Sequence, residues 1–173
     1  MKIGITGPNR IYNGNVEERK KILDEVAEMI AKSGNEIILT PDKNSLLEHF
    51  GKRYLELGGK KVWLVVPTEE ADHENYLSTK IGEIMSSKDW SRQADEFTKN
   101  SDVLLCVGYA WGALKEIACA QYSKGKKVYI IKEFISSKLP KELNFLVEYI
   151  SLGSLKKLLP NKFPNDRHKV RKN

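Results

Sequence analysis

Short runs of β-branched and other apolar residues alternate with helical patterns, and this alternation constrains the fold more than any other feature. Five runs resemble strands buried on both faces, at residues 2–6, 36–40, 61–67, 102–108 and 126–132. Segments of helical periodicity separate them, between Asn15 and Gly34 and at residues 44–57, 89–100 and 112–124. Strands that alternate with helices in this way predict a mostly parallel sheet with right-handed crossovers, which is a three-layer α/β sandwich.

The ends of the first helix carry local signals of their own. Asn15 and Glu18 have the spacing of an N-cap with its partner, and Gly34 stands where a C-terminal stop is expected. Residues 68–88 are polar, with at most a short helix. A last helix near 141–147, a short strand at 147–151 and a small helix at 153–159 complete the expected elements.

Composition limits the class of protein. The chain has 173 residues, of which 40% are apolar and 30% charged, as expected for one globular domain over residues 1–160. No apolar run approaches the ~20 residues that span a bilayer, and MKIGITG does not resemble a signal peptide. The two cysteines, Cys106 and Cys119, have no metal-ligand spacing and are expected as reduced thiols. We therefore expect a cytoplasmic protein without membrane partners.

The net charge of +6 gathers at one end of the chain. From Lys162 onward, five Lys and Arg residues oppose the single Asp166, so the tail at 161–173 is basic. Such a tail is either a solvated terminus or a contact for nucleic acid.

Parallel sheets of this kind bind ligands beyond the carboxyl ends of their strands, where the strand order reverses. This rule selects three turns, at residues 6–12, 40–46 and 108–112. The residues in them that we expect to contact a ligand are Gly7, Pro8, Asn9, Thr40, Asp42, Gly108, Tyr109, Trp111, Gly112 and Ala113.

The turn at 108–112 precedes a helix that carries Glu116. The first N–H groups of a helix have no intrahelical acceptor and carry partial positive charge, so they can receive a phosphate or carboxylate. Gly108 and Gly112 would allow the turn and a close backbone approach, although turn chemistry alone also explains them. From spacing alone, Glu116 is either an ordinary solvated residue or a carboxylate that points into the crevice.

Residues 108–116, GYAWGALKE, resemble the P-G-G-x-G-T-x-x-E motif of Lonely-Guy (LOG) type proteins, a Rossmann-like family. Gly112 matches the third glycine and Glu116 the glutamate, while Tyr109, Ala110 and Ala113 replace two glycines and the threonine. Residues 39–67 are similar to a second family segment and keep its Gly58, Gly59 and Pro67, with Thr40-Pro41-Asp42 where three glycines are usual.

The resemblance implies that a nucleotide-like small molecule is the ligand. LOG proteins cleave the N-glycosidic bond of nucleoside monophosphates with the motif glutamate and an arginine, which here implies Glu116 and Arg92 as catalytic residues. The carboxylate would stabilise the oxocarbenium character that develops on the ribose. The resemblance also implies a homodimer. We expect no cofactor, and no metal, since His49 and His73 lack a second ligand at metal spacing.

The replaced glycines predict weaker phosphate binding than the complete motif would give. One lost hydrogen bond to a charged group costs about 1.5–3 kcal/mol, which Arg10, Lys43 or Lys115 would have to offset. Tyr109 and Trp111 either stack on a flat ligand or pack at an interface.

Three functions therefore remain open from the sequence. The first is a nucleotide N-glycosidase, and the second is a module that binds or senses a nucleotide without turnover. The third is a nucleic-acid-binding protein that uses the basic tail.

Overall fold

The computed structural model describes residues 1–10, 15–122 and 125–159. It contains one seven-stranded, all-parallel sheet with the order β4-β3-β2-β1-β5-β6-β7. The strands are β1 (Lys2–Thr6), β2 (Glu36–Leu39), β3 (Val62–Val66), β4 (Glu83–Ser86), β5 (Val103–Cys106), β6 (Val128–Ile131) and β7 (Val147–Ile150). The sequence-based prediction of a parallel α/β sheet is confirmed.

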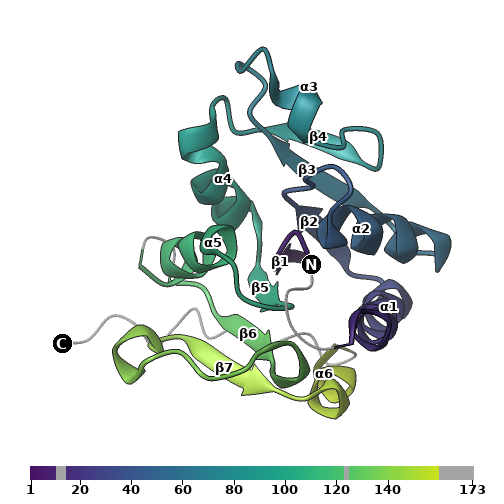
Figure 1. The fold of residues 1–173 in the computed structure, drawn as a ribbon, viewed down its shortest axis with the longest axis vertical. Coiled ribbons are helices and arrows are strands. Elements are labelled where there is room, and N and C mark those ends of the chain that lie inside the picture. Colours follow the sequence, from purple (N-terminus) through teal and green to yellow (C-terminus); the bar gives the residue numbers. More distant parts are fainter. Residues whose placement is uncertain (11–14, 123–124, 160–173) are drawn as a thin grey trace.

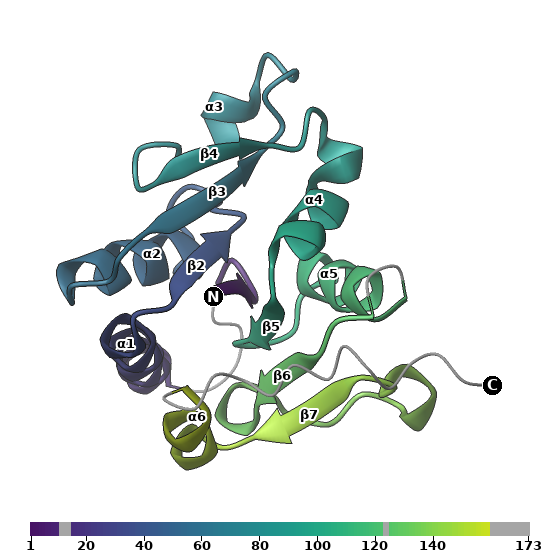
Figure 2. The same cartoon turned by 180° about the vertical axis from the view of Figure 1, so that it is seen from behind.

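Helices cover both faces of this sheet and make the outer layers of the sandwich (Figure 1). The described helices are α1 (Val16–Ser33), α2 (Leu46–Glu56), α3 (His73–Tyr76), α4 (Gln93–Asn100), α5 (Trp111–Tyr122) and α6 (Leu152–Leu158). The pair α1 and α2 packs together on one face with α6 near them, whereas α4 and α5 pack together on the other (Figure 2). Short 3-10 turns lie at Trp90–Arg92, Lys132–Phe134 and Lys141–Leu143.

The first long helix begins and ends where its sequence signals predict. The Asn15 side chain accepts hydrogen bonds from the N–H groups of Glu17 and Glu18, which satisfies two donors that the helix itself leaves free. Gly34 ends the helix in the left-handed conformation at φ 70°. The N-cap at Asn15 and the C-terminal stop at Gly34 are confirmed.

Two expectations about local structure are wrong. The short helix expected within residues 68–88 is present as α3, but residues 83–86 of the same polar segment form the edge strand β4, which the sequence does not predict. Its side chains are mostly exposed, so an edge strand of this kind lacks the apolar run that marks a buried one. Residues 141–143 form a single 3-10 turn where a helix over 141–147 is expected, because β7 already begins at Val147.

A close contact between β1 and α4 fixes one side of the core. A Cβ atom added to Gly4 would lie 2.4 Å from the Ser101 hydroxyl oxygen and 2.9 Å from the Phe97 ring. Phe97 is fully buried. The glycine in this strand is therefore required by the packing of α4, a reason that KIGIT by itself does not reveal.

No helix in the described part of the chain combines the length and the apolar character that crossing a bilayer requires.

The predicted basic tail at 161–173 lies outside the described residues.

Candidate functional site

The strand order reverses at β1, because β2 adjoins it on one side and β5 on the other. Beyond the carboxyl ends of these strands lies a cavity of about 350 Å³, here called the switch-point cavity. It is lined by Gly7, Asn9, Thr40, Asp42, Leu47, Gln93, Ala110, Trp111, Gly112, Ala113 and Glu116. The three turns that the sequence selects therefore meet at one place.

Two glycines allow the loop after β1 to approach the end of β5. Gly108 has φ 130°, a conformation that favours glycine, and a Cβ atom there would lie 2.9 Å from the buried Pro8. A Cβ atom on Gly7 would lie 2.7 Å from a methyl group of Val107. The loop after β1 thus forms one wall of the cavity.

The start of α5 forms a second wall, and its first amides are free. Leu114 donates its N–H to the carbonyl of Ala110 at 2.9 Å. The N–H groups of Trp111, Gly112 and Ala113 have no acceptor among the described residues. A Cβ atom on Gly112 would meet nothing within 4 Å, so the approach to these donors is open. A hydrogen-bond acceptor on a ligand can occupy this position.

Glu116 points inward from α5 and is held by two hydroxyl groups. It is only 7% exposed. Thr6, the last residue of β1, donates its hydroxyl to one carboxylate oxygen, and Thr40, which follows β2, donates to the other at 3.3 Å. Of the two interpretations left open by the sequence, the structure supports the carboxylate that faces the crevice.

Burial changes the acid strength of this group. Removal from water raises the pKa of Glu116 from 4.5 to about 7, and the neighbouring Asp42 carboxylate adds to the rise. The hydrogen bonds from Thr6 and Thr40 oppose this shift but do not cancel it. Burial also raises the pKa of Asp42, to which the Asn9 side chain donates a hydrogen bond. Both acids are therefore easier to protonate than ordinary surface carboxylates.

Four residues singled out by the sequence do not line the cavity: Pro8, Arg92, Gly108 and Tyr109. Pro8 and Gly108 shape the loop beneath it. Tyr109 packs against the core cluster that contains Cys106. Of the two aromatic residues in the turn, only Trp111 lines the cavity, and it is 89% exposed.

Arg92 and Glu116 are not brought together by any contact between described residues. Arg92 lies on the 3-10 turn before α4, where its guanidinium faces the Asp89 carboxylate at 3.5 Å. Its side chain is more than half exposed. The adjacent Gln93, the first residue of α4, lines the cavity in its place.

Of the groups around Glu116, the sequence predicted Thr40 but missed the hydroxyl of Thr6 and the amide of Gln93. The Gln93 nitrogen donates to the Val65 carbonyl at 3.0 Å, so this hydrogen bond fixes the orientation of the amide. Leu47 and Ala110 complete the wall. The end of β1 was a usable signal for Thr6, because the last side chain of a parallel strand borders the same crevice as the loop after it.

The three basic residues named as compensating charges lie in different places. Lys43 donates to the Glu74 carbonyl, and Lys115 faces an apolar groove on the outside of α5. Arg10 lines a separate cavity beside the first one. In the described part of the chain, no three His, Cys, Asp or Glu side chains gather in a way that would hold a metal ion.

Comparisons with known proteins agree with this architecture. The model of the SLOG cluster4 family matches residues 1–154. No curated protein matches the chain significantly.

Solved structures of the same fold include two proteins of similar length. The molybdenum cofactor binding protein from Rippkaea orientalis is 19% identical, with a TM-score of 0.70 over 89% of this chain and 91% of that one. The molybdenum cofactor carrier protein from Chlamydomonas reinhardtii is 20% identical, with a TM-score of 0.70 over 90% and 94%. At these identities the likeness establishes a shared fold.

Proposed function

The chain belongs to the SLOG cluster4 family, and from this premise we propose that it binds a phosphorylated, nucleotide-like small molecule in the switch-point cavity. SLOG abbreviates SMF/DprA-LOG, so the resemblance to LOG proteins is confirmed. One observation carries the proposal: the free amides of α5 and the buried carboxylate of Glu116 open into the same cavity. Its volume of about 350 Å³ is within the range of small-molecule sites.

The polar groups of the cavity divide into donors and acceptors. The amides of Trp111, Gly112 and Ala113 are donors at one side. The carboxylates of Asp42 and Glu116 are acceptors when ionised, and the Gln93 side-chain oxygen is a further acceptor, in an amide that the hydrogen bond from its nitrogen to Val65 orients. A ligand that fits must therefore present acceptors to α5 and hydroxyl or amino groups to the acids. Heterocyclic bases and sugars of nucleotides carry both.

Binding without turnover is the form of this function that the observations favour. The related structures are described as a cofactor binding protein and a cofactor carrier protein, which supports a binding role for this fold. The position of Arg92 outside the cavity lining also supports binding over hydrolysis, because it removes the implied catalytic partner from Glu116.

The proposal predicts that Glu116→Gln weakens nucleotide binding. Calorimetric titration with adenosine and guanosine 5′-monophosphates at pH 8 should give an affinity at least about tenfold lower than that of the unaltered protein, since a charged acceptor is lost. The matched control is Glu25→Gln, which alters an exposed glutamate on α1 and should leave the affinity unchanged. If neither nucleotide binds the folded, unaltered protein, the proposed ligand class is wrong.

A second candidate, hydrolysis of the N-glycosidic bond, is favoured by the acid strength of Glu116. A pKa of about 7 suits a group that donates or accepts a proton near neutral pH. In the same titrations, chromatography would detect free base if the protein turns the nucleotide over. If the nucleotide stays intact after prolonged incubation with protein that binds it, hydrolysis is excluded and binding is the only role left.

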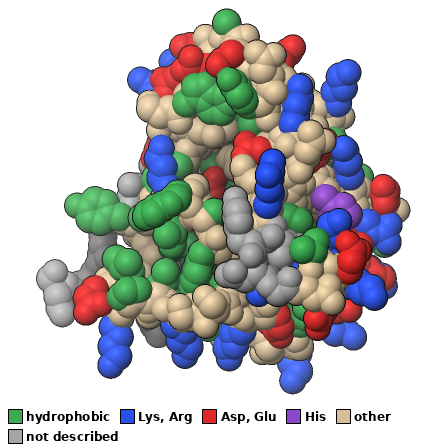
Figure 3. Space-filling view, in the orientation of Figure 1, with side chains coloured by type: hydrophobic (Ala, Val, Ile, Leu, Met, Phe, Trp, Pro, Cys, Tyr) green, Lys and Arg blue, Asp and Glu red, His purple; other side chains and the backbone are tan. Residues whose placement is uncertain are grey.

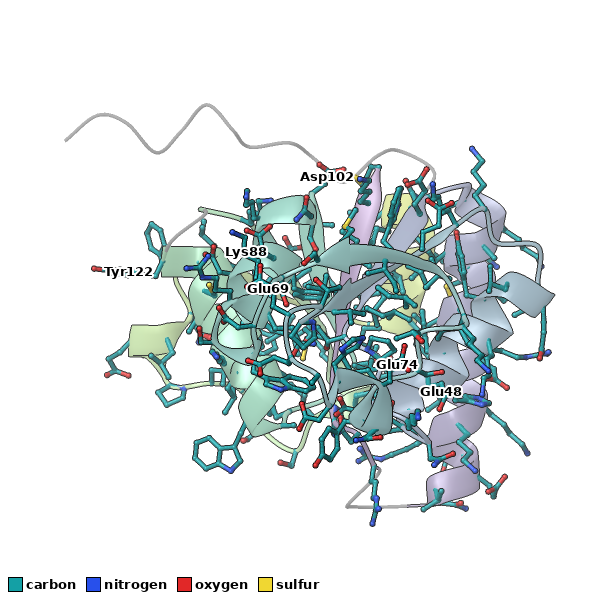
Figure 4. All side chains as sticks on the ribbon, turned by 90° about the horizontal axis from the view of Figure 1, so that it is seen from above. Glu48, Glu69, Glu74, Lys88, Asp102 and Tyr122 are labelled. Atoms are coloured by element: carbon teal, nitrogen blue, oxygen red, sulfur yellow. The ribbon has the colours of Figure 1, made fainter. Side chains whose placement is uncertain are left out.

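The homodimer also remains a proposal, and one surface supports it. A groove of about 910 Å³, here called the apolar groove, runs along the outside of α5 and is lined by Trp111, Leu114, Lys115, Ile117, Ala118, Gln121, Tyr122, Gly125, Leu139, Glu142, Leu143 and Phe145. Figure 3 shows hydrophobic side chains gathered over this region, and Figure 4 shows Tyr122 projecting away from the body. Tyr122 is 95% exposed and Phe145 72%. Patches of this kind mark interaction sites.

A second copy of the chain fits this groove by charge as well, because Lys115 and Glu142 both line it. In a two-fold arrangement each lysine can meet the partner's glutamate. The double change Tyr122→Glu with Phe145→Glu should halve the molar mass measured by sedimentation equilibrium. A monomeric unaltered protein at micromolar concentration would contradict the dimer. Contact of the tail with nucleic acid remains a third, weaker proposal, since those residues lie outside the described range.

A further inference from the structure

The switch-point cavity is poorly suited to a phosphate group. Two acids line it, Asp42 and Glu116, and among the described residues no lysine or arginine does. A phosphate dianion at the α5 amides would therefore share the cavity with two carboxyl groups, which repel it whenever they are ionised. The amides suit an uncharged acceptor, such as a base carbonyl or ring nitrogen, better than they suit an anion here.

A second cavity of about 470 Å³ lies beside the first and has the opposite character. It is here called the basic cavity, and its charged and ionisable lining consists of Arg10, Lys20, Glu48, His49 and Lys52. Asn9 lines both cavities, and its side chain donates a hydrogen bond to Asp42 in the first. The two cavities are therefore neighbours, with Asn9 between them.

The one carboxylate of the basic cavity is fully engaged within the protein. Glu48 accepts hydrogen bonds from the Asn44 N–H at 2.5 Å and the Ser78 hydroxyl at 2.9 Å, and Lys52 lies 2.6 Å from the same carboxylate. The positive charge of Lys52 is thereby balanced. His49 is directed to Asp24, at 2.8 Å. Neither of these two residues supplies a spare positive charge.

Arg10 and Lys20 supply the excess charge. Arg10 is exposed and has no hydrogen-bond or ion-pair partner among the described residues. Lys20 faces Glu17 at 3.6 Å, a loose pair in which the glutamate side chain is 77% exposed and therefore well screened by solvent. The arginine can hold two oxygens of a phosphate at once, and the lysine adds a second cation.

Two of the first amides of α2 are already engaged within the protein and are not free to bind an anion in this cavity. The Leu46 N–H donates to the Asn9 carbonyl at 3.0 Å, and the Glu48 N–H donates to the Ser45 hydroxyl at 3.1 Å. Recognition of an anion would rest on the side chains of Arg10 and Lys20.

We infer that the phosphate of the ligand binds in the basic cavity, between Arg10 and Lys20, while the uncharged part occupies the switch-point cavity. This deepens the proposed function, because it assigns the charged group of the same ligand to a separate subsite. The turn at 108–112 lacks the glycines that would help to bind a phosphate, and Arg10, in the loop after β1, supplies a cation that compensates for them.

The test uses inorganic phosphate as the probe and amide NMR spectra of the whole chain as the readout. Saturating phosphate should shift the amide signals of Asn9, Arg10, Asn44 and Ser45 and leave those of Gly112 and Ala113 unchanged. The double variant Arg10→Ala with Lys20→Ala should raise the phosphate dissociation constant at least about tenfold. The unaltered protein should lose affinity as NaCl is added, because ions screen exposed charges.

The control for charge is Lys32→Ala with Lys99→Ala, which removes two exposed lysines that are paired elsewhere, with Glu28 and Glu96. It should leave the phosphate affinity unchanged. Shifts confined to Gly112 and Ala113, equal losses in both double variants, or no phosphate-dependent shifts at all would each overturn the inference. Because the probe has no base or sugar, these results are independent of whether the switch-point cavity binds a nucleotide.

Discussion

Glu116→Gln should make the protein more stable than the unaltered chain above pH 7, by about 3 kcal/mol. A rise in pKa from 4.5 to about 7 on folding means that the folded state resists ionisation of this group. Each tenfold difference in proton affinity corresponds to about 1.4 kcal/mol, which gives this magnitude for a fully buried carboxyl group. Glutamine keeps the shape and the oxygen that accepts from Thr6 or Thr40, without the charge.

The direction of the pH dependence follows from which state binds more protons. Between pH 4.5 and 7 the unfolded chain has lost this proton while the folded protein keeps it, so the stability of the unaltered protein falls as pH rises. Below pH 4.5 both states are protonated, and the two proteins should have nearly equal stability. Above pH 7 both states are ionised, and the difference reaches a plateau.

Urea denaturation at steps from pH 4 to pH 8.5 would measure this difference directly. Asp42→Asn serves as a comparison, because the pKa of Asp42 is also raised by burial and its removal should change stability in the same direction. A difference between Glu116→Gln and the unaltered protein that stays constant with pH would show that Glu116 is not a buried acid. An ionised group that is buried lowers the stability of the folded protein. We expect a protein to keep such a group where it helps to bind a ligand.

The second large effect concerns the core: Phe97→Ala should lower the free energy of unfolding by about 3–5 kcal/mol. The ring is fully buried and packs between α4 and the backbone of β1, where Gly4 leaves room for it. Its loss would leave a cavity beside Gly4 and Ser101, neither of which has a side chain large enough to fill it. For a chain of this length the midpoint of thermal unfolding should fall by roughly 10 °C.

Tyr76→Ala is the matched control for this change, since it removes an aromatic ring that is 58% exposed and makes only an edge contact with Trp90. It should cost less than about 1 kcal/mol. Equal losses of stability in the two variants, measured by urea denaturation, would contradict the packing described for α4. The comparison separates burial from the mere loss of an aromatic side chain.

The parallel sheet was predictable because its signals are local. Runs such as residues 103–107 are buried on both faces, so every side chain in them is apolar. Each such strand can therefore be recognised from its own sequence. The edge strand β4 has mostly exposed side chains and no such run, which is why the sequence did not reveal it. The helix expected near 141–147 is wrong for a related reason: the apolar residues Leu143 and Phe145 are exposed there, so apolar character in this segment does not mark a buried helix.

The sequence by itself determined the architecture of this protein and the turn at which Glu116 lies, because strand and helix periods and motif spacing act over a few residues. Only the tertiary structure decided which side chains meet. One step along a helix rotates a side chain by about 100°, which is enough to place Gln93 on the cavity wall and Arg92 outside it. Arg10 and Lys20 likewise share a cavity only because the loop after β1 and helix α1 fold against the start of α2.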